Sequence, residues 1–312
     1  MTDLSSAMED YLAVRRALGH KMDMADRLLG QFATYYEQVG ATRITNDLAV
    51  AWAILPVGAS AGWWAQRLGV VRGFSAWFQT LDPETEVPPA DLLTGRAGRV
   101  VPYLYSDADI AAMMDAASGL AFPLQRHTYE TLVGLLAITG LRIGEAIRLD
   151  RGDVLPDAGV VRIITSKFGK SREVPLHPTT VEALRRYGHH RDRLCPAPVA
   201  DSFFVSIRGT RLSYSVVQPT FAKLARQAGL EPRSPRCRPR IHDVRHSFAV
   251  RALVDCYAAG GDAQALLPLL STFMGHTDPK STYWYLSAAP ELMSLAGRRL
   301  EDAFEAELDV DR

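Results

Sequence analysis

Residues 270–290 read LSTFMGHTDPKSTYWYLSAAP, in which a Gly275-His276 pair precedes three consecutive aromatic residues. We interpret this stretch as the place where a tyrosine hydroxyl is presented to a phosphate. A phenol has a pKa of about 10, so it attacks poorly unless its target is activated by positive charge and proton donors. The rest of the chain is therefore expected to supply such groups to residues 270–290.

The first candidate donor lies in TGLRIGE, residues 139–145. A glycine ends a helical pattern there, and Arg142 and Glu145 follow at a spacing that puts both on one helix face. On this fragment alone, a surface ion pair is as good an interpretation as a functional one. In the functional interpretation, Arg142 is directed at a phosphate and Glu145 buttresses the turn.

The second candidate is Lys167, in the polar, glycine-containing segment SKFGKS. Alternation predicts strands at 160–165 and 173–176, so the segment between them is the expected tip of a β-hairpin. A lysine in a turn is usually only solvated. A hairpin tip, however, can reach into a DNA groove and deliver one proton to a leaving oxygen.

The third motif is HDVRH, residues 242–246, in a predicted helix. His242 and Arg245 lie one turn apart on one face, which pairs a titratable imidazole with a planar cation suited to phosphate. His246 is expected to point elsewhere. In the opening stretch, Tyr285 follows His276 by nine residues, and Tyr283 is a competing nucleophile that a helix would turn away from Tyr285.

Periodicity and punctuation predict the remaining elements. Ser106 and Asn46 are expected helix N-caps, and Ser202 to Ser206 (SFFVS) is a possible third strand. Helices are expected at 5–18, 22–40, 46–53, 59–80, 107–117, 179–192, 213–228, 241–259, 262–274, 279–286 and 289–306. Residues 130–149 carry a strong apolar pattern that Gly140 interrupts.

In this order, the motifs resemble those of the tyrosine recombinases, also called phage-type integrases. TGLRIGE resembles the first arginine box, and SKFGKSREVPL resembles the hairpin, with the catalytic lysine at Lys167 rather than Lys170. HDVRHSFA resembles the His-x-x-Arg box, although Val244 stands where leucine is usual. MGH followed by Tyr285 resembles the end of the domain. The resemblance covers most of residues 100–305.

The resemblance and the helical patterns imply a mostly α fold with a small β-sheet (α+β). Residues 1–90 are expected to form a helical, SAM-like core-binding domain that binds DNA. Residues 81–101 turn irregular, with Asp82-Pro83, Pro88-Pro89 and Gly95, and residues 91–105 are the expected linker. Residues 106–312 are the expected tyrosine-recombinase catalytic domain with its C-terminal helix.

The resemblance also implies a mechanism that needs neither cofactor nor metal. Tyr285 would attack a phosphodiester and form a 3′-phosphotyrosyl link. The resemblance implies that Arg142, Arg245 and His276 stabilise the charge of the transition state. Lys167 would protonate the departing 5′ oxygen, and His242 would assist proton movement at the tyrosine. Four protomers would act on two duplexes, each docking a C-terminal helix, about 290–307, on a neighbour.

The charge distribution sharpens these expectations. The formal net charge is +0, which argues mildly against nucleic-acid binding, but basic residues gather between 208 and 251. The expected DNA-binding residues in that region are Arg208, Arg211, Arg236, Arg238 and Arg240. The tail after Ala289 is acidic.

The cysteines and the distribution of apolar residues limit the class of protein. Cys195, Cys237 and Cys256 form no C-x-x-C pair, so reduced thiols are expected and a zinc site is not. There is no apolar run long enough for a membrane span and no signal-peptide pattern in residues 1–20. A cytoplasmic, nucleoid-associated protein is therefore expected.

Several alternatives stay open at this stage. The chain is either a recombinase, a catalytically silent DNA-binding accessory subunit, or an enzyme with type IB topoisomerase-like relaxation activity. A transposon, an integron-like element, a phage and chromosome-dimer resolution are all compatible settings, and the closing segment is similar to recombinases of mobile elements. The partner protomers are copies of this chain or related recombinases in a hetero-assembly.

Overall fold

The structure, a computed structural model, describes residues 3–93, 101–164 and 171–275. The chain divides into two compact units, Met1–Val100 and Val101–Arg312, which are described separately below. The helices expected at 279–286 and 289–306 lie outside the described residues. No helix in the described part is both long and apolar enough to cross a membrane.

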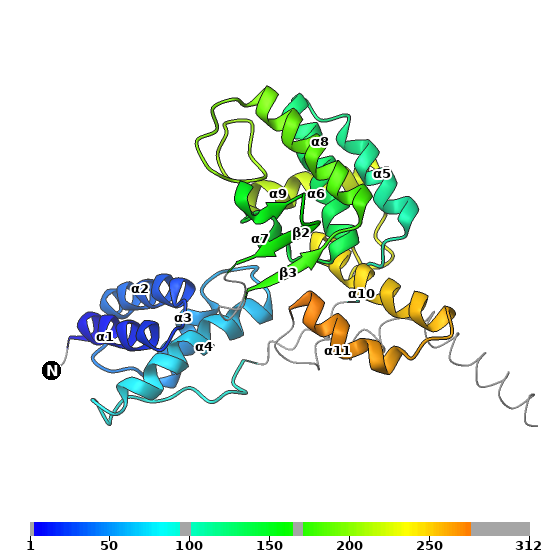
Figure 1. Ribbon diagram of the computed structural model, residues 1–312. Coiled ribbons are helices and arrows are strands. Elements are labelled where there is room, and N and C mark those ends of the chain that lie inside the picture. The colour runs from blue at the N-terminus through cyan, green and yellow to red at the C-terminus, as the bar shows by residue number, and fades with distance from the viewer. Residues whose placement is uncertain (1–2, 94–100, 165–170, 276–312) are drawn as a thin grey trace, which may run out of the picture. The chain divides into compact units, whose positions relative to one another are not determined.

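The first unit is helical throughout its described length. Its helices are α1 (Leu4–Ala17), α2 (Asp23–Gln38), α3 (Asn46–Ile54) and α4 (Ala61–Phe78). Figure 1 shows them in blue to cyan. Aromatic side chains of three of these helices meet in the core, where Phe32, Trp52 and Phe74 are fully buried. The expected N-cap at Asn46 is wrong by one residue, because the side chain of Thr45 accepts from the amide of Leu48 at 3.2 Å.

A buried arginine closes the end of α3. Arg67 of α4 donates to the carbonyl oxygens of Trp52 at 2.9 Å and Ala53 at 3.1 Å, and its guanidinium lies 3.8 Å from the centre of the Trp52 ring. The last carbonyls of a helix have no partner within the helix, so a cation placed there satisfies them. Arg67 is only 6% exposed, and these carbonyls offset much of the cost of burying its charge.

The second unit contains seven α-helices in its described part. They are α5 (Asp107–Ala117), α6 (Pro123–Thr139), α7 (Ile143–Ala146), α8 (Pro178–Leu194), α9 (Tyr214–Gln227), α10 (Ile241–Ala258) and α11 (Ala263–Met274). α6 packs between α5 and α8, and it also contacts α10 (Figure 1). The expected N-cap at Ser106 is confirmed, since Ser106 and Asp109 form a reciprocal capping box at the start of α5.

The small sheet of the second unit is antiparallel, in the order β1 (Val154–Leu155), β2 (Val160–Ile163) and β3 (Arg172–Pro175), and a short 3-10 helix, η1 (Arg151–Asp153), precedes β1. Val161 and Val174 pair across β2 and β3 and are fully buried. The hairpin predicted around residues 165–172 is therefore confirmed in its two strands, while its tip lies outside the described residues.

The prediction of a strand at residues 202–206 is wrong. This segment forms only isolated bridges, at Ser202 and at Val205. Its two neighbouring aromatics, Phe203 and Phe204, are both buried. A strand turns successive side chains to opposite faces, so two consecutive buried rings suit an irregular segment that is enclosed on both sides.

The start of the second unit is hydrogen-bonded to α10. The amide of Tyr103 donates to the carboxylate of Asp243 at 3.2 Å, and the amide of Tyr105 donates to the hydroxyl of Ser247 at 2.8 Å. The hydroxyl of Tyr105 donates in turn to the carbonyl oxygen of Arg240 at 3.1 Å. Asp243 is completely buried, so this attachment is an interior one.

Gly140 ends α6 in the left-handed region, with φ 59°. A side chain there meets two obstacles. A Cβ atom would overlap the ring of Phe248 at Cδ1, and the backbone conformation itself disfavours residues other than glycine. The turn that leads into Arg142 therefore depends on glycine at this position.

We predict that Gly140→Ala lowers the free energy of unfolding by about 2 kcal/mol or more, because strain and overpacking add. The matched control is Gly188→Ala, within α8, where a Cβ meets no atom within 4 Å. This control is expected to raise stability by about 0.5–1 kcal/mol through helix propensity. Denaturant unfolding measures both, and an equally stable Gly140→Ala protein would contradict the account of this turn.

Candidate active site

Three arginines converge on the C-terminal end of α11. Each donates to one of three consecutive backbone carbonyl oxygens, which belong to the last residues that the structure describes before His276. The bonds are Arg172 Nε to Phe273 O at 2.9 Å, Arg245 Nη2 to Met274 O at 2.7 Å and Arg142 Nη2 to Gly275 O at 3.0 Å. We call Arg142, Arg172 and Arg245 the arginine clamp. The end of a helix carries partial negative charge, so it suits three cations.

Glu145 is the anion of the arginine clamp. One of its oxygens accepts from Nη1 of Arg142 at 2.8 Å and from Nη1 of Arg172 at 3.2 Å. The other accepts from Nη2 of Arg172 at 2.9 Å and from the amide of Arg142 at 3.0 Å. The Glu145 side chain is 1% exposed, so the surface ion pair that the sequence left open is excluded. The carboxylate does buttress the turn, and it also links the arginine box to β3 through Arg172.

The environment of Glu145 holds it ionised. Burial alone raises the pKa of its carboxyl group. The hydrogen bonds and charge of Arg172, together with the hydrogen bonds of Arg142, outweigh burial and lower the pKa to about 2. The carboxylate is therefore charged at neutral pH.

Arg245 links two helix ends. It is 3% exposed, and its Nη1 donates to the carbonyl oxygen of Gly140 at 2.6 Å while Nη2 reaches Met274. Gly275, like Gly140, has a left-handed conformation, with φ 68°. Two glycine-terminated helices, α6 and α11, thus present their final carbonyls to Arg245 and Arg142. Both arginines are therefore held by backbone carbonyls of helix ends that are distant from them in sequence.

His242 lies one turn before Arg245 on α10 and is exposed to solvent. Loss of hydration among the surrounding protein atoms, followed by the positive charge of Arg245, lowers the pKa of its imidazole, with Asp243 opposing. Arg142 contributes to the same lowering. The expectation that His246 points elsewhere is wrong: its ring packs edge-on against His242 with centroids 4.9 Å apart, because residues four apart share a helix face.

Three of the predicted site residues, Lys167, His276 and Tyr285, lie outside the described residues. Their chain neighbours do not. Gly275 directly precedes His276, and β3 begins five positions after Lys167. Gly275 is bonded by Arg142 of the arginine clamp, and β3 begins with Arg172, which is itself a member of the clamp.

The five arginines expected to bind DNA divide into two groups. Arg208, Arg236 and Arg238 are exposed. Arg211 is engaged with Asp150 and the carbonyl oxygen of Ile147. Arg240 makes a two-point ion pair with Asp243, at 2.7 and 2.9 Å.

Arg172 was not among the residues singled out from the sequence. A signal was nevertheless present. Side chains two apart in a strand share a face, and Arg172 shares one with the buried Val174. An arginine on the inward face of a strand requires an anion or carbonyl partner, which Glu145 and Phe273 supply.

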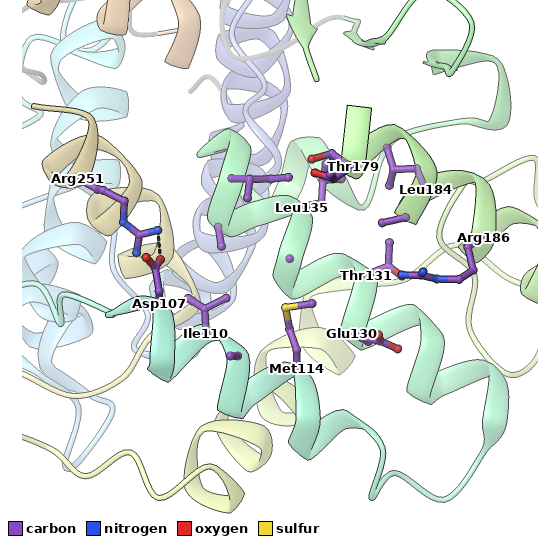
Figure 2. Close-up of a pocket in the computed structure, with 16 residues that line it drawn as sticks. Asp107, Ile110, Met114, Glu130, Thr131, Leu135, Thr179, Leu184, Arg186 and Arg251 are labelled. Atoms are coloured by element: carbon purple, nitrogen blue, oxygen red, sulfur yellow. Dashed lines mark ion pairs between the residues drawn. The ribbon is translucent and has the colours of Figure 1, made fainter. Parts of the chain in front are cut away.

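A cavity elsewhere in the second unit has a different character. It encloses about 300 Å³ among α5, α6 and α8, and Figure 2 shows Ile110, Met114, Leu135 and Leu184 around it. Arg251 on its rim is paired with Asp107 (Figure 2). Its lining is mostly apolar and shares no residue with the arginine clamp. The cavity is therefore separate from the arginine clamp.

Comparison with known proteins gives a consistent result. The Phage integrase family matches residues 105–291. The protein y4rB of Sinorhizobium fredii, named as an integrase/recombinase, is 43% identical, covering 98% of this chain and 99% of that protein. The tyrosine recombinase XerC of Rhodospirillum centenum is 30% identical, covering 85% of this chain and 76% of that protein.

Two solved structures share the fold. The XerH site-specific recombinase in a post-cleavage complex with difH aligns with a TM-score of 0.64 at 18% identity, covering 90% of this chain and 78% of that chain. The Tn1549 transposon integrase in complex with transposon right end DNA aligns with a TM-score of 0.63, also at 18% identity, covering 95% of this chain and 98% of that chain. At these identities the likeness concerns architecture.

We predict that Glu145→Gln removes an acid-sensitive part of the protein's stability. A lowered pKa in the folded state means that the carboxylate stabilises the fold above its ordinary pKa of 4.5 and ceases to do so as the pH falls towards 2. The variant is expected to lose roughly 3–5 kcal/mol at neutral pH and to show a flatter stability profile below pH 4.5. Denaturant unfolding at a series of pH values measures this, with the exposed Glu173→Gln as control. Parallel profiles for the two variants would contradict it.

Proposed function

Because this chain belongs to the phage integrase family, we propose that the arginine clamp, Lys167, His276 and Tyr285 form one active site, which cleaves and rejoins DNA through a phosphotyrosyl intermediate. The chain is a DNA strand-transferring tyrosine recombinase. The observation that carries the assignment of the site is the convergence of Arg142 and Arg245 on the two carbonyls that precede His276.

In the proposed reaction, the oxygen of Tyr285 attacks the phosphorus of a phosphodiester and the bond to the 5′ oxygen breaks. Lys167 gives a proton to that oxygen, and the phosphate remains esterified to the tyrosine at the 3′ end. A 5′-hydroxyl of another strand then attacks the phosphotyrosine and restores the phenol. One phosphate ester is exchanged for another in each step, so the sequence requires neither nucleotide hydrolysis nor an oxidant.

The arginine clamp suits the charge that develops in this reaction. Negative charge grows on the non-bridging oxygens, and fixed donors such as Arg142, Arg245 and His276 are each worth roughly 10²–10³ in rate. Arg142 and Arg245 are held by carbonyls and by Glu145, so they need little reorganisation when phosphate arrives. The lowered pKa of His242 keeps its imidazole neutral near pH 7, which suits a group that accepts the tyrosine proton.

DNA binding would use exposed arginines whose side chains form no ion pair with any other described residue. Arg208, Arg236 and Arg238 meet this description, whereas Arg240 holds Asp243 and Arg211 holds Asp150. We assign the helical first unit to binding the core of the DNA site. We further propose that four protomers act together on two duplexes. The reaction would take place in the cytoplasm and serve a mobile element.

We predict that Tyr285→Phe abolishes covalent protein–DNA adducts on a nicked duplex and leaves DNA affinity within about twofold, because only the attacking oxygen is lost. The matched control is Tyr283→Phe, which removes a phenol two positions away and is expected to retain adduct formation. Denaturing gel electrophoresis of a labelled duplex with the full-length protein measures both.

The opposite pattern, adducts with Tyr285→Phe and none with Tyr283→Phe, would reassign the nucleophile. A wild-type protein that binds the duplex but never forms an adduct would favour a silent accessory subunit. A protein that relaxes supercoiled DNA as a monomer, without joining two DNA sites, would favour a topoisomerase-like enzyme.

We predict that the double variant Arg236→Ala, Arg238→Ala weakens DNA binding alike for specific and unrelated sequences. Each lost phosphate contact lowers the slope of log K against log salt by about 0.9, so the slope should fall by about 2. The charge-matched control, Arg185→Ala with Arg193→Ala, removes two exposed arginines of α8 and should leave the slope unchanged. Equal slopes for the two double variants would remove this loop from the DNA interface.

A further inference from the structure

Arg172 occupies the junction of three segments that the proposed reaction must bring together. It begins β3, the strand that follows the segment bearing Lys167. It bonds Glu145 of the arginine box through both of the carboxylate's oxygens. It also bonds Phe273 at the end of α11. Its side chain is 14% exposed, whereas that of Arg142 is 25% exposed, so Arg172 lies on the inner side of the shared carboxylate.

The shape of the guanidinium explains how one residue holds three segments. Nη1 and Nη2 meet the two oxygens of Glu145 side by side, at 3.2 and 2.9 Å, while Nε points along a different edge to Phe273 at 2.9 Å. This planar, two-edged arrangement fixes both the position and the plane of the Glu145 carboxylate. A lysine ammonium carries one charge at one point and cannot satisfy both edges at once.

The carboxylate transmits this constraint to Arg142. Oε1 of Glu145 is shared by Nη1 of Arg172 and Nη1 of Arg142, and Oε2 is shared by Nη2 of Arg172 and the amide of Arg142. Without Arg172, Glu145 loses two of these four hydrogen bonds and keeps those from Arg142, so the plane of the carboxylate that holds Arg142 is less firmly set. The two guanidinium groups therefore act through a single anion.

The last residue before His276 is also constrained by Arg172. A Cβ added to Gly275 would lie 2.7 Å from Nη1 and 2.9 Å from Cζ of Arg172. The close approach brings the backbone at the end of α11 against the flat face of the guanidinium. The glycine of the Met-Gly-His sequence is thus explained by Arg172 as well as by its φ of 68°.

We propose that Arg172 is a positioning residue for strand cleavage, which sets the orientation of Arg142 through Glu145 and holds the start of β3 against the end of α11. The inference rests on the proposed function and extends it to a residue outside the predicted catalytic set. Arg172 acts through Glu145 and the α11 carbonyls and does not itself contact the reacting phosphate.

The test compares Arg172→Met and Arg172→Lys with Arg162→Met in the full-length protein. Arg162 lies on the neighbouring strand and makes an exposed ion pair with Glu173 at 3.7 Å, so its variant removes an arginine–glutamate pair from the same sheet without touching the arginine clamp. Cleavage is measured in a single turnover on a nicked duplex, with enzyme saturating over DNA, at several pH values. DNA affinity and the unfolding midpoint are measured for each variant.

We expect both Arg172 variants to cleave roughly 100-fold more slowly at saturation, since small misplacement of catalytic groups costs about that much. DNA affinity is expected to stay within about threefold, and Arg172→Lys is expected not to rescue the rate. The acid limb of the rate profile should move to higher pH in Arg172→Met, because Glu145 loses its strongest partner. Adding Glu145→Gln to Arg172→Met should cost little more than either change alone, since the two residues act as one unit.

Cleavage by Arg172→Met and Arg172→Lys at the wild-type rate and pH dependence would overturn the positioning role and leave the proposed function intact. An equal loss in Arg162→Met would also overturn it, because the effect would then be a general one of the sheet. Absence of any adduct with the wild-type protein would overturn the proposed function and this inference with it. Where Arg172→Met does not fold, Arg172→Lys, which retains the charge, decides the question.

Discussion

One buried carboxylate, that of Glu145, makes the rest of the site possible. Arg142 and Arg172 come from separate segments and carry like charges, which would repel each other in the interior without an anion between them. Glu145 accepts four hydrogen bonds from these two residues and has no fewer than two partners on each oxygen. A buried ion pair adds little stability by itself, yet it specifies geometry, and geometry is what a phosphate-binding site requires.

The protein uses the ends of helices to place its cations. Arg67 in the first unit satisfies the final carbonyls of α3, and the arginine clamp in the second unit satisfies those of α11. Carbonyls at a helix end are fixed by the hydrogen bonds of the turn before them. An arginine bound there inherits that rigidity, so the orientation of its guanidinium is set largely by backbone rather than by other mobile side chains.

Local patterns predicted the parts of the fold that depend on local interactions. Most of the helices, the capping box at Ser106 and the paired strands β2 and β3 follow from periodicity and caps within short windows, whereas α6 begins at Pro123, before the apolar pattern that was recognised from residue 130. The pairing of Arg142 with Glu145 was equally accessible, because the two residues are three apart.

The errors arose where distant residues decide the outcome. Phe203 and Phe204 have high strand propensity but are enclosed from both sides by the second unit's core, and no pattern within SFFVS reveals that enclosure. Arg172 meets Glu145 and Phe273 across 27 and 101 positions of sequence. The attachment of Tyr103 to Asp243 spans 140 positions, and it has a mechanical consequence. Since Tyr103 and Tyr105 are hydrogen-bonded to the helix that bears His242 and Arg245, the backbone that enters the second unit is anchored directly to an element of the candidate site.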